Sequence, residues 1–288
     1  MKKRQWTAFP HPQDGFNYPG PALKKNWGRL HQGDREPFPS ADWVAQMFKD
    51  SPDAKKSAGK LGANPEVVAE KLQDAWRAFH RGDFQQAAEE GDKLGLAGYT
   101  VANKATGIYA NYLERDLKAR LALLEEAAAR AEEARKALPE HANAHYLLAY
   151  CLGRYSQGIS VVKALAQGLG TRIGQALKRT LELEPKHAEA HMASGTWHAE
   201  ILDKVGGLVG GLTYGASREK ALQHFRKAME LEPKSAIARV EYAGGLLMLE
   251  RTKQAEAKKL LAEAAKAKPA DAMEWLDADS AAKRLAEL

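Results

Sequence analysis

The chain has 288 residues, of which 44% are hydrophobic and 28% are charged, a composition typical of a globular protein and not of a disordered or fibrous one. No apolar run approaches the roughly 18 residues of a membrane-spanning helix, and the basic start lacks the apolar stretch of a secretory signal, so we expect no transmembrane segment. The single cysteine excludes an internal disulfide and a cysteine-built zinc site and fits a reducing compartment, which favours a cytoplasmic protein.

Residues 1–62 differ from the rest of the chain, and we expect them to form a basic N-terminal arm. They contain seven of the 12 prolines, and the first 60 residues hold 11 Lys/Arg against 6 Asp/Glu, most of the net charge of +6. Burial of an aromatic side chain contributes roughly 2 kcal/mol, so the many aromatics of the arm predict that it packs on the rest of the chain as a cap. The alternative is that the basic arm binds an acidic partner.

An echo within the arm suggests a degenerate repeat. The stretch NWGRLHQGD at 26–34 resembles AWRAFHRGD at 75–83, which aligns Trp27 with Trp76 and His31 with His80. The glycine and aspartate that end the second stretch, Gly82 and Asp83, predict a turn between two helices.

Four similar sequence segments recur in the remainder of the chain, and each ends in a proline: Pro139, Pro185, Pro233 and Pro269. Proline rarely continues a helix, so a helix should end before each, and the first of these helices should run from 117 to 138. Small or apolar residues stand twelve, eight and five positions before each proline, a spacing that puts them on one helix face. These residues are Ala127, Ala131 and Ala134; Ile173, Leu177 and Thr180; Ala221, Phe225 and Ala228; and Ala257, Leu261 and Ala264.

This pattern resembles the tetratricopeptide repeat (TPR), in which two antiparallel helices recur about every 34 residues. Gly195 in a first helix, the small–large–small face of the second helices and the closing prolines carry the resemblance. It implies an all-α fold: an α-solenoid of TPR-like helix-turn-helix repeats over residues 63–288, with two Gly-rich apolar insertions and the packing arm at 1–62.

In the TPR family, ligands usually lie in a concave groove lined by the first helices. The mostly apolar residues expected there disfavour an acidic peptide tail and favour an amphipathic helix or another apolar ligand. The equal alternative is that the N-terminal arm fills the groove. The candidate groove residues are Asn143, Tyr146, Tyr150, Glu189, Met192, Thr196, Ile237, Val240 and Leu247.

The first two distances between these prolines, 46 and 48 residues, exceed the TPR period of about 34 residues. They predict insertions at 156–172 and 204–217. Both are glycine-bearing and aliphatic, and exposed apolar patches usually mark binding surfaces. We expect the two insertions to bury each other, or alternatively to enclose a lipid or another apolar small molecule. Their apolar faces comprise Ile159, Val162 and Leu169, and Val205, Leu208, Val209 and Leu212.

Catalytic chemistry is not indicated. No serine–histidine–aspartate order, HExxH or phosphate-loop motif occurs, and GLGTRIG at 168–174 lacks the preceding strand of a dinucleotide site. HANAH and HAEAH place paired histidines on one helix face, where packing between helices is favoured over metal binding. Cys151 should be a buried, inert thiol. We therefore expect no enzyme activity, no cofactor, no metal and no specific nucleic-acid binding.

The C-terminal half, over roughly residues 140–288, also resembles the regulator of microtubule dynamics family. Trp197 in a first helix, an insertion ending in a small-residue turn, ALQHFRKAMELEP at 221–233 and the final helix with DADSAAKRLAEL carry this resemblance. It implies the fold and the insertions, and more weakly a lipid ligand, but it does not imply microtubule binding. The sequence thus predicts a non-catalytic scaffold that binds a protein partner in an apolar groove, or alternatively a binder or carrier of a lipid or other apolar small molecule.

Overall fold

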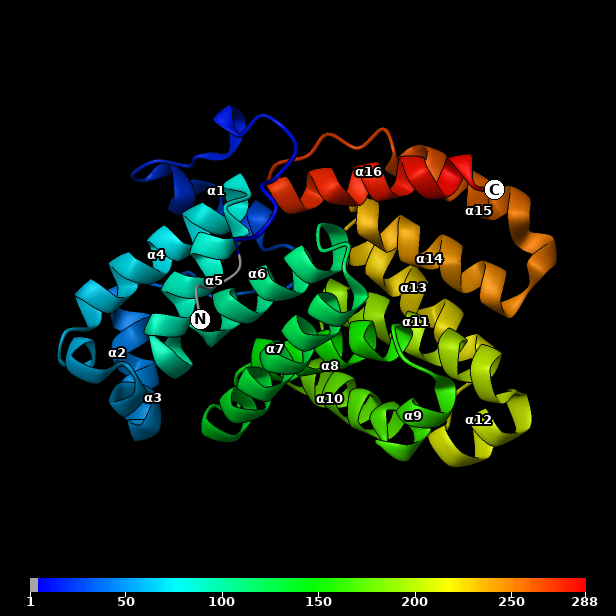
Figure 1. Cartoon of the computed structure of the whole chain (residues 1–288), viewed down its shortest axis with the longest axis horizontal. Coiled ribbons are helices and arrows are strands. Elements are labelled where there is room, and N and C mark those ends of the chain that lie inside the picture. The colour runs from blue at the N-terminus through cyan, green and yellow to red at the C-terminus, as the bar shows by residue number, and fades with distance from the viewer. Residues whose placement is uncertain (1–4) are drawn as a thin grey trace. The chain divides into compact units, whose positions relative to one another are not determined.

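The computed structural model describes residues 5–288, and within these residues the fold is all-α, with 16 α-helices and no strand (Figure 1). The all-α prediction is therefore confirmed, and the arrangement is consistent with an α-solenoid. The helices fall into two compact units. The first comprises residues 5–30 and 36–158, and the second comprises residues 31–35 and 159–288. The boundary expected at 62/63 lies inside the first unit.

The first unit carries eight α-helices, and from α4 onward each packs on the next along the chain. Their bounds are α1 (Ala22–Leu30), α2 (Ala41–Asp50), α3 (Pro52–Ser57), α4 (Pro65–Arg81), α5 (Phe84–Lys93), α6 (Tyr99–Tyr112), α7 (Leu117–Ala137) and α8 (Ala142–Gln157). The helix predicted at 117–138 is α7. The predicted turn at Gly82 and Asp83 separates α4 from α5, and the φ of Gly82 is +94°, a conformation that favours glycine.

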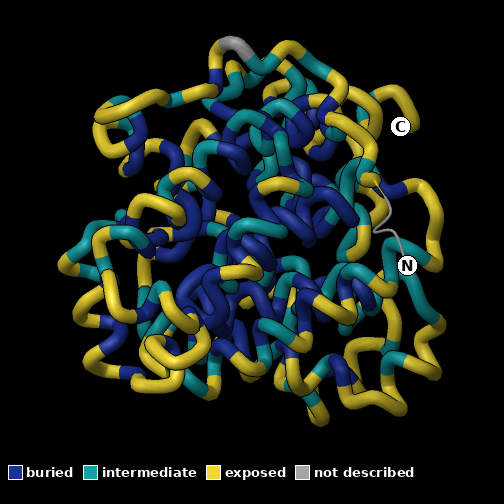
Figure 2. The backbone as a smooth tube through the Cα atoms, turned by 60° about the vertical axis from the view of Figure 1, so that its left-hand side comes forward, coloured by how far each residue is buried: buried dark blue, intermediate teal, exposed yellow. Residues whose placement is uncertain are grey.

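The second unit carries the other eight α-helices, and α10, α11, α13, α14, α15 and α16 form its packed body. The bounds are α9 (Val161–Ala166), α10 (Leu169–Leu183), α11 (Ala188–Val205), α12 (Gly207–Tyr214), α13 (Arg218–Leu231), α14 (Ala236–Leu249), α15 (Gln254–Ala264) and α16 (Ala272–Ala286). In Figure 2, buried and exposed positions alternate along most helices, as expected for helices that pack on one side.

The helix face predicted from the four segments that end in proline is buried in all four helices that carry it, α7, α10, α13 and α15. The α13 face shows why small residues are needed around a large one. A Cβ added at Gly195 of α11 would lie 2.8 Å from the Phe225 ring, and one at Gly245 of α14 would lie 2.4 Å from it. Glycine on both flanking helices therefore lets the ring fill the space between them.

The helix-ending prolines are held by a recurring contact. The carbonyl of Pro139 lies 2.9 Å from Nε2 of His145, and the carbonyl of Pro185 lies 3.1 Å from Nε2 of His191. At the third turn, Arg239 donates to the carbonyl of Pro233 over 2.7 Å. In each case the side chain six residues after the proline contacts the proline carbonyl, which lies in the turn between two helices.

Much of the N-terminal arm packs on helices of the first unit, as its aromatics predict. Phe9 is buried against Gly82, and the indole of Trp6 stacks on the ring of Tyr109 with 4.2 Å between centroids. The two tryptophans aligned by the echo, Trp27 and Trp76, meet edge to face at 5.7 Å. No second helix follows α1 directly as α5 follows α4, because residues 35–40 are not helical.

Candidate binding surfaces

The candidate groove residues lie on three first helices, but several of them are part of the core. On α8, Tyr146 is buried. On α11, Met192 packs with Ala228 and Ala238, and on α14, Val240 belongs to another buried cluster. A partner could touch these side chains only by displacing core packing. The partly exposed members of the set are Tyr150, Glu189, Thr196, Ile237 and Leu247.

Some partly exposed members of the set have side-chain contacts inside their own unit. The Thr196 hydroxyl donates to the buried carboxylate of Glu241 over 3.0 Å, and Arg154 lies over the Tyr150 ring at 5.4 Å. The set as a binding surface therefore stays a prediction, and its accessible part is smaller and more polar than the sequence suggests.

A turn of the N-terminal arm occupies the start of α11 in the second unit. The backbone N–H of Glu189 donates to the carbonyl of Gly33 over 3.0 Å, and Gln32 donates to the carbonyl of Leu231. The approach is close, because a Cβ at Gly33 would lie 2.6 Å from a Glu232 oxygen and 3.1 Å from Cγ of Glu189. Residues 31–35 are thus packed on this unit, although the residues on both sides of them belong to the first unit.

In the first unit, Glu36 of the arm contacts the start of α8. The amide of Asn143 donates to the carboxylate of Glu36 over 2.6 Å, and the carbonyl of Glu36 accepts from the Trp27 indole over 2.7 Å. His141 lies 3.4 Å from the same carboxylate, which is almost wholly buried. Two of the nine candidate groove residues, Asn143 and Glu189, therefore contact the chain's own arm.

The residues of the two predicted insertions form the short helices α9 and α12. Val162 is 77% exposed, Leu208 77% and Leu212 82%, whereas Leu169 is buried at the start of α10. Our expectation that the insertions bury each other is therefore wrong, because their largest aliphatic side chains face outward. Ile159 and Val205 are partly buried, and Val209 is exposed. The predicted faces are divided between helices: Leu169 lies on α10 and Val205 ends α11, while Leu208, Val209 and Leu212 lie on α12.

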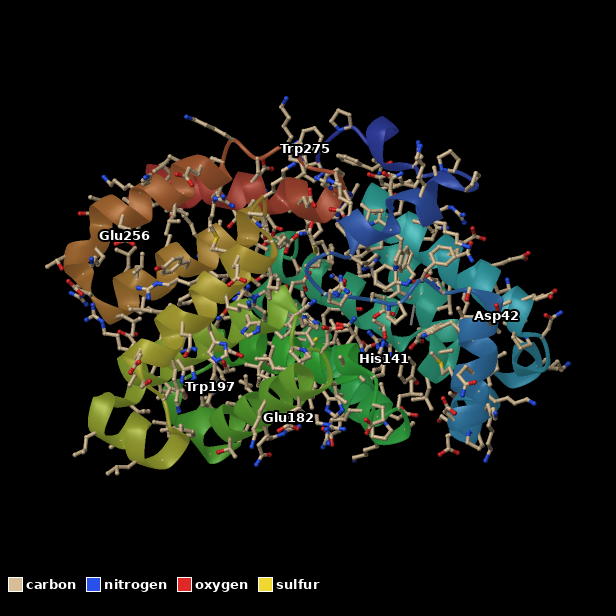
Figure 3. The ribbon with its side chains drawn as sticks, turned by 180° about the vertical axis from the view of Figure 1, so that it is seen from behind. Asp42, His141, Glu182, Trp197, Glu256 and Trp275 are labelled. Atoms are coloured by element: carbon tan, nitrogen blue, oxygen red, sulfur yellow. The ribbon has the colours of Figure 1, made fainter. Side chains whose placement is uncertain are left out.

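A cavity of about 610 Å³ lies beside these segments in the second unit, between α10, α11, α12 and α13. Thr171 and Thr213 bring both segments to its lining, and Trp197 and Glu182, labelled in Figure 3, also line it. The Trp197 indole donates to the carbonyl of Gly170 over 2.9 Å, which fixes the ring at the cavity wall. Sequence reasoning missed this cavity, since its lining comes from four separate helices.

Two histidines line this cavity, and a third contacts one of them. His198 and His224 line it, and Nδ1 of His224 lies 2.9 Å from Nδ1 of His191. Burial, and then the neighbouring His191 and Lys220, lower the pKa of His224 from 6.5 to about 4. Burial, together with His224 and Lys220, lowers the pKa of His198 to about 4. Both imidazoles are therefore neutral near pH 7.

Within residues 5–288, no group of three or more His, Cys, Asp and Glu side chains is arranged to hold a metal ion. One histidine of each pair, His145 and His191, instead contacts a proline carbonyl. Cys151 is fully buried, and burial raises the pKa of its thiol to about 12, in agreement with the predicted inert cysteine. No helix in the described part of the chain is long and apolar enough to cross a membrane.

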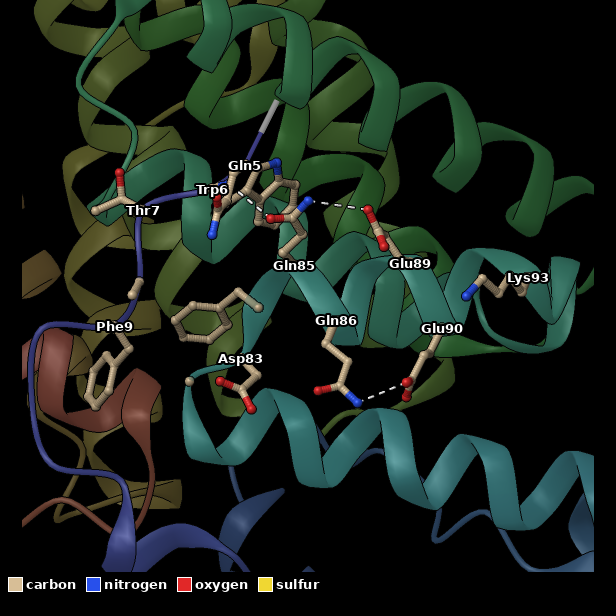
Figure 4. A pocket seen from close by; sticks show the side chains of 13 residues that line it. Gln5, Trp6, Thr7, Phe9, Asp83, Gln85, Gln86, Glu89, Glu90 and Lys93 are labelled. Carbon is tan, nitrogen blue, oxygen red and sulfur yellow. Dashed lines mark hydrogen bonds between the residues drawn. The ribbon is translucent and has the colours of Figure 1, made fainter. Parts of the chain in front are cut away.

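A second cavity, of about 470 Å³, lies in the first unit between the arm and α5 (Figure 4). The backbone N–H of Trp6 donates to Gln85 over 2.9 Å, and Gln85 in turn donates to Glu89 over 3.2 Å. Gln86 and Glu90 form the same contact one residue further along. The hydrogen bond from Trp6 to Gln85 holds the arm at this wall, and nothing in the helix pattern of the sequence predicts it.

Stacked helices without a strand in the described residues define an all-α protein whose architecture is consistent with an α-solenoid. The family model for Regulator of microtubule dynamics protein 1-3 matches residues 97–288. The chain therefore belongs to this family, and the match contains the region over which the sequence resembles it. A comparison with curated proteins gave no individual protein that matches the chain.

Proposed function

We propose that the chain is a non-catalytic helical-repeat protein of the TPR type that binds a segment of a partner protein at the starts of its first helices. One observation carries the proposal: the chain's own arm already binds there. The N-terminal turn of a helix has backbone N–H groups without helical partners, and Gly33 supplies a carbonyl to one of them on α11. A helix start also favours negative charge, and Glu36 lies at the start of α8.

The arm contact indicates the kind of segment that would bind. A non-helical turn with an exposed carbonyl suits the start of α11 in the second unit. Arg35 adds an ion pair, 3.9 Å from the carboxylate of Glu184, that is partly exposed and contributes little. In this proposal the arm competes with the partner, so the partner binds the chain once the arm has been displaced.

Microtubules are the partner to test first, because the family is described by its regulation of microtubule dynamics. The test is co-sedimentation of the full chain with polymerised tubulin. Gly33→Asp places a third carboxylate beside Glu189 and Glu232, and the repulsion should detach the arm. Binding should then strengthen, by about tenfold if the arm covers the site nine-tenths of the time.

The matched control is Gly28→Asp, because no atom lies within 4 Å of a Cβ added at Gly28. That variant should bind as the unaltered chain does. Absence of the chain from the pellet in every variant would reject microtubules as the partner. Equal binding by both variants would reject the arm as the competitor.

A second function is favoured by the cavity beside Trp197. We infer that this space holds a lipid chain or another apolar small molecule, because residues of both aliphatic segments reach it and its volume falls in the range of ligand sites. Native mass spectrometry of the chain purified from cells should detect a co-purifying ligand. Gln175→Trp adds a large ring to the lining and should lower ligand occupancy, whereas Arg172→Trp on the same helix but outside the lining should not. Ligand-free protein in all three preparations would reject this function.

A further inference from the structure

The most exposed aliphatic side chains of the described chain gather on two short helices of the second unit. In the view of Figure 1, α9 and α12 lie at one end of this unit, and both contact α10. Val162 on α9 and Leu208 and Leu212 on α12 are each at least 77% exposed. Val161, Leu165 and Val209 are also exposed. We call these six side chains the aliphatic patch.

The two helices are held at the same end by a defined contact. A Cβ added at Gly170, between α9 and the body of α10, would lie 2.9 Å from the ring of Tyr214, the last residue of α12. The same added atom would lie 3.2 Å from Ile201 of α11. The helices that carry the patch therefore pack on α10 and α11, and the side chains of the patch lie on the exposed side of these helices.

Glycines set α12 apart from the helices on either side of it. Gly206 and Gly215 flank it with φ values of +83° and +65°, which side chains rarely adopt. These two positions let α12 turn away from α11 and α13, so that Leu208 and Leu212 are not folded back onto the unit. An exposed aliphatic patch of this kind marks an interaction surface.

The two segments that carry the patch contain only basic charged residues, but four of these residues form ion pairs with Glu182, Glu200 or Glu250 just outside the segments. Residues 159–181 contain no Asp or Glu and four basic residues, and residues 204–218 contain no Asp or Glu and two basic residues. The basic residues are Lys163, Arg172, Lys178, Arg179, Lys204 and Arg218. This basic border therefore carries a small excess of positive charge, which complements a negatively charged surface.

The chemistry of the patch favours a lipid surface over a protein. Protein interfaces concentrate their binding energy in Trp, Tyr and Arg and leave Leu and Val under-represented. The patch consists of Val and Leu alone, on helices of six and eight residues. Aliphatic side chains with a basic border are instead the pattern of segments that rest in the interface of an anionic membrane.

We propose that α9 and α12 form a docking surface for an anionic phospholipid bilayer, with the aliphatic patch entering the headgroup boundary and the basic border facing the lipid charges. This surface is distinct from the helix starts that bind the arm, so its test is independent of the proposed protein partner.

The test is flotation of the full chain with phosphatidylcholine vesicles that do or do not contain phosphatidylserine. The chain should float with the phosphatidylserine vesicles and less with the others, and added salt should weaken the binding. The double variant Leu208→Ser/Leu212→Ser should bind about tenfold more weakly. The matched control is Leu117→Ser/Met248→Ser, which removes two exposed apolar side chains outside the patch and should change nothing.

A labelled variant reports insertion directly. Leu212→Cys can be modified with a polarity-sensitive fluorophore while the fully buried Cys151 stays unlabelled. Its emission should shift to the blue on phosphatidylserine vesicles, and the emission of Leu117→Cys should not. The proposal is overturned if the chain does not float, if the serine double variant binds as the unaltered chain does, or if Leu212→Cys shows no shift. Loss of a concentration-dependent dimer in the double variant, without vesicle binding, would assign the patch to a second copy of the chain instead.

Discussion

Nδ1 of His191 and Nδ1 of His224 lie 2.9 Å apart, and the other ring nitrogen of His191 lies 3.1 Å from the carbonyl of Pro185. A carbonyl only accepts, so Nε2 of neutral His191 carries the proton and its Nδ1 accepts from His224. The contact thus requires His191 to be neutral, whereas His224 donates through Nδ1 in either protonation state. Burial lowers the pKa of each, and the pKa of His224 falls to about 4.

This pair predicts that stability falls in mild acid. The pKa of His224 is about 4 in the fold and near 6.5 when unfolded, so the unfolded state binds protons first as the pH falls. The stability that neutral His224 contributes is fully present above about pH 6.5 and should be lost progressively as the pH falls toward about 4. Thermal unfolding followed by circular dichroism across this range measures it.

Lys220 and Lys227 oppose protonation of the pair, and Glu230 favours it only at His191. His224→Gln keeps a donor toward His191 without a titrating ring. This variant should therefore show a shallower fall in melting temperature than the unaltered chain. Equal slopes would contradict the assigned role of His224.

The packing of Phe225 predicts opposite effects at neighbouring glycines. Gly245→Ala would put a methyl group 2.4 Å from the ring and should lower the free energy of unfolding by roughly 1–3 kcal/mol. Gly244→Ala, one residue earlier on α14, meets only the end of Arg284 at 3.6 Å and should be neutral or stabilising by up to about 1 kcal/mol. Urea unfolding of both variants makes the comparison, and a more stable Gly245→Ala would refute the close packing.

Because the thiol of Cys151 is buried, we expect it to react slowly with thiol reagents. Cys151 is fully buried, and a pKa of about 12 leaves almost no thiolate at neutral pH. A disulfide reagent should therefore modify the folded chain only as fast as the protein opens, and should react at once in denaturant. Rapid stoichiometric labelling of the native chain would show that α8 is not packed as described.

The sequence predicted the helix ends and buried faces well, because both depend on local spacing. The prolines before α8, α11 and α14 and the faces around Ala131, Leu177 and Phe225 need only a helical period. Burial of Tyr146 and Met192 was not foreseen, because helical phase tells which residues share a face and not which helix covers it.

Long-range features were beyond the sequence pattern. Nothing in the sequence around Gly33 predicts its contact with α11, because the contact is made by a backbone carbonyl, which every residue has. The cavity at Trp197 depends on side chains of four helices, and the outward position of Leu208 and Leu212 depends on how the glycines at 206 and 215 turn the chain. Apolar spacing identified α12 as unusual, but spacing cannot say whether such a helix is covered.

The central claim is that the starts of the first helices bind a non-helical segment, and a peptide of residues 30–38 tests it most directly. Fluorescence anisotropy of this labelled peptide with the Gly33→Asp chain should show saturable binding, and the unaltered chain should bind about tenfold more weakly because its own arm competes. A scrambled peptide should bind neither. Equal binding of the peptide to both chains, or none to the variant, would contradict the account.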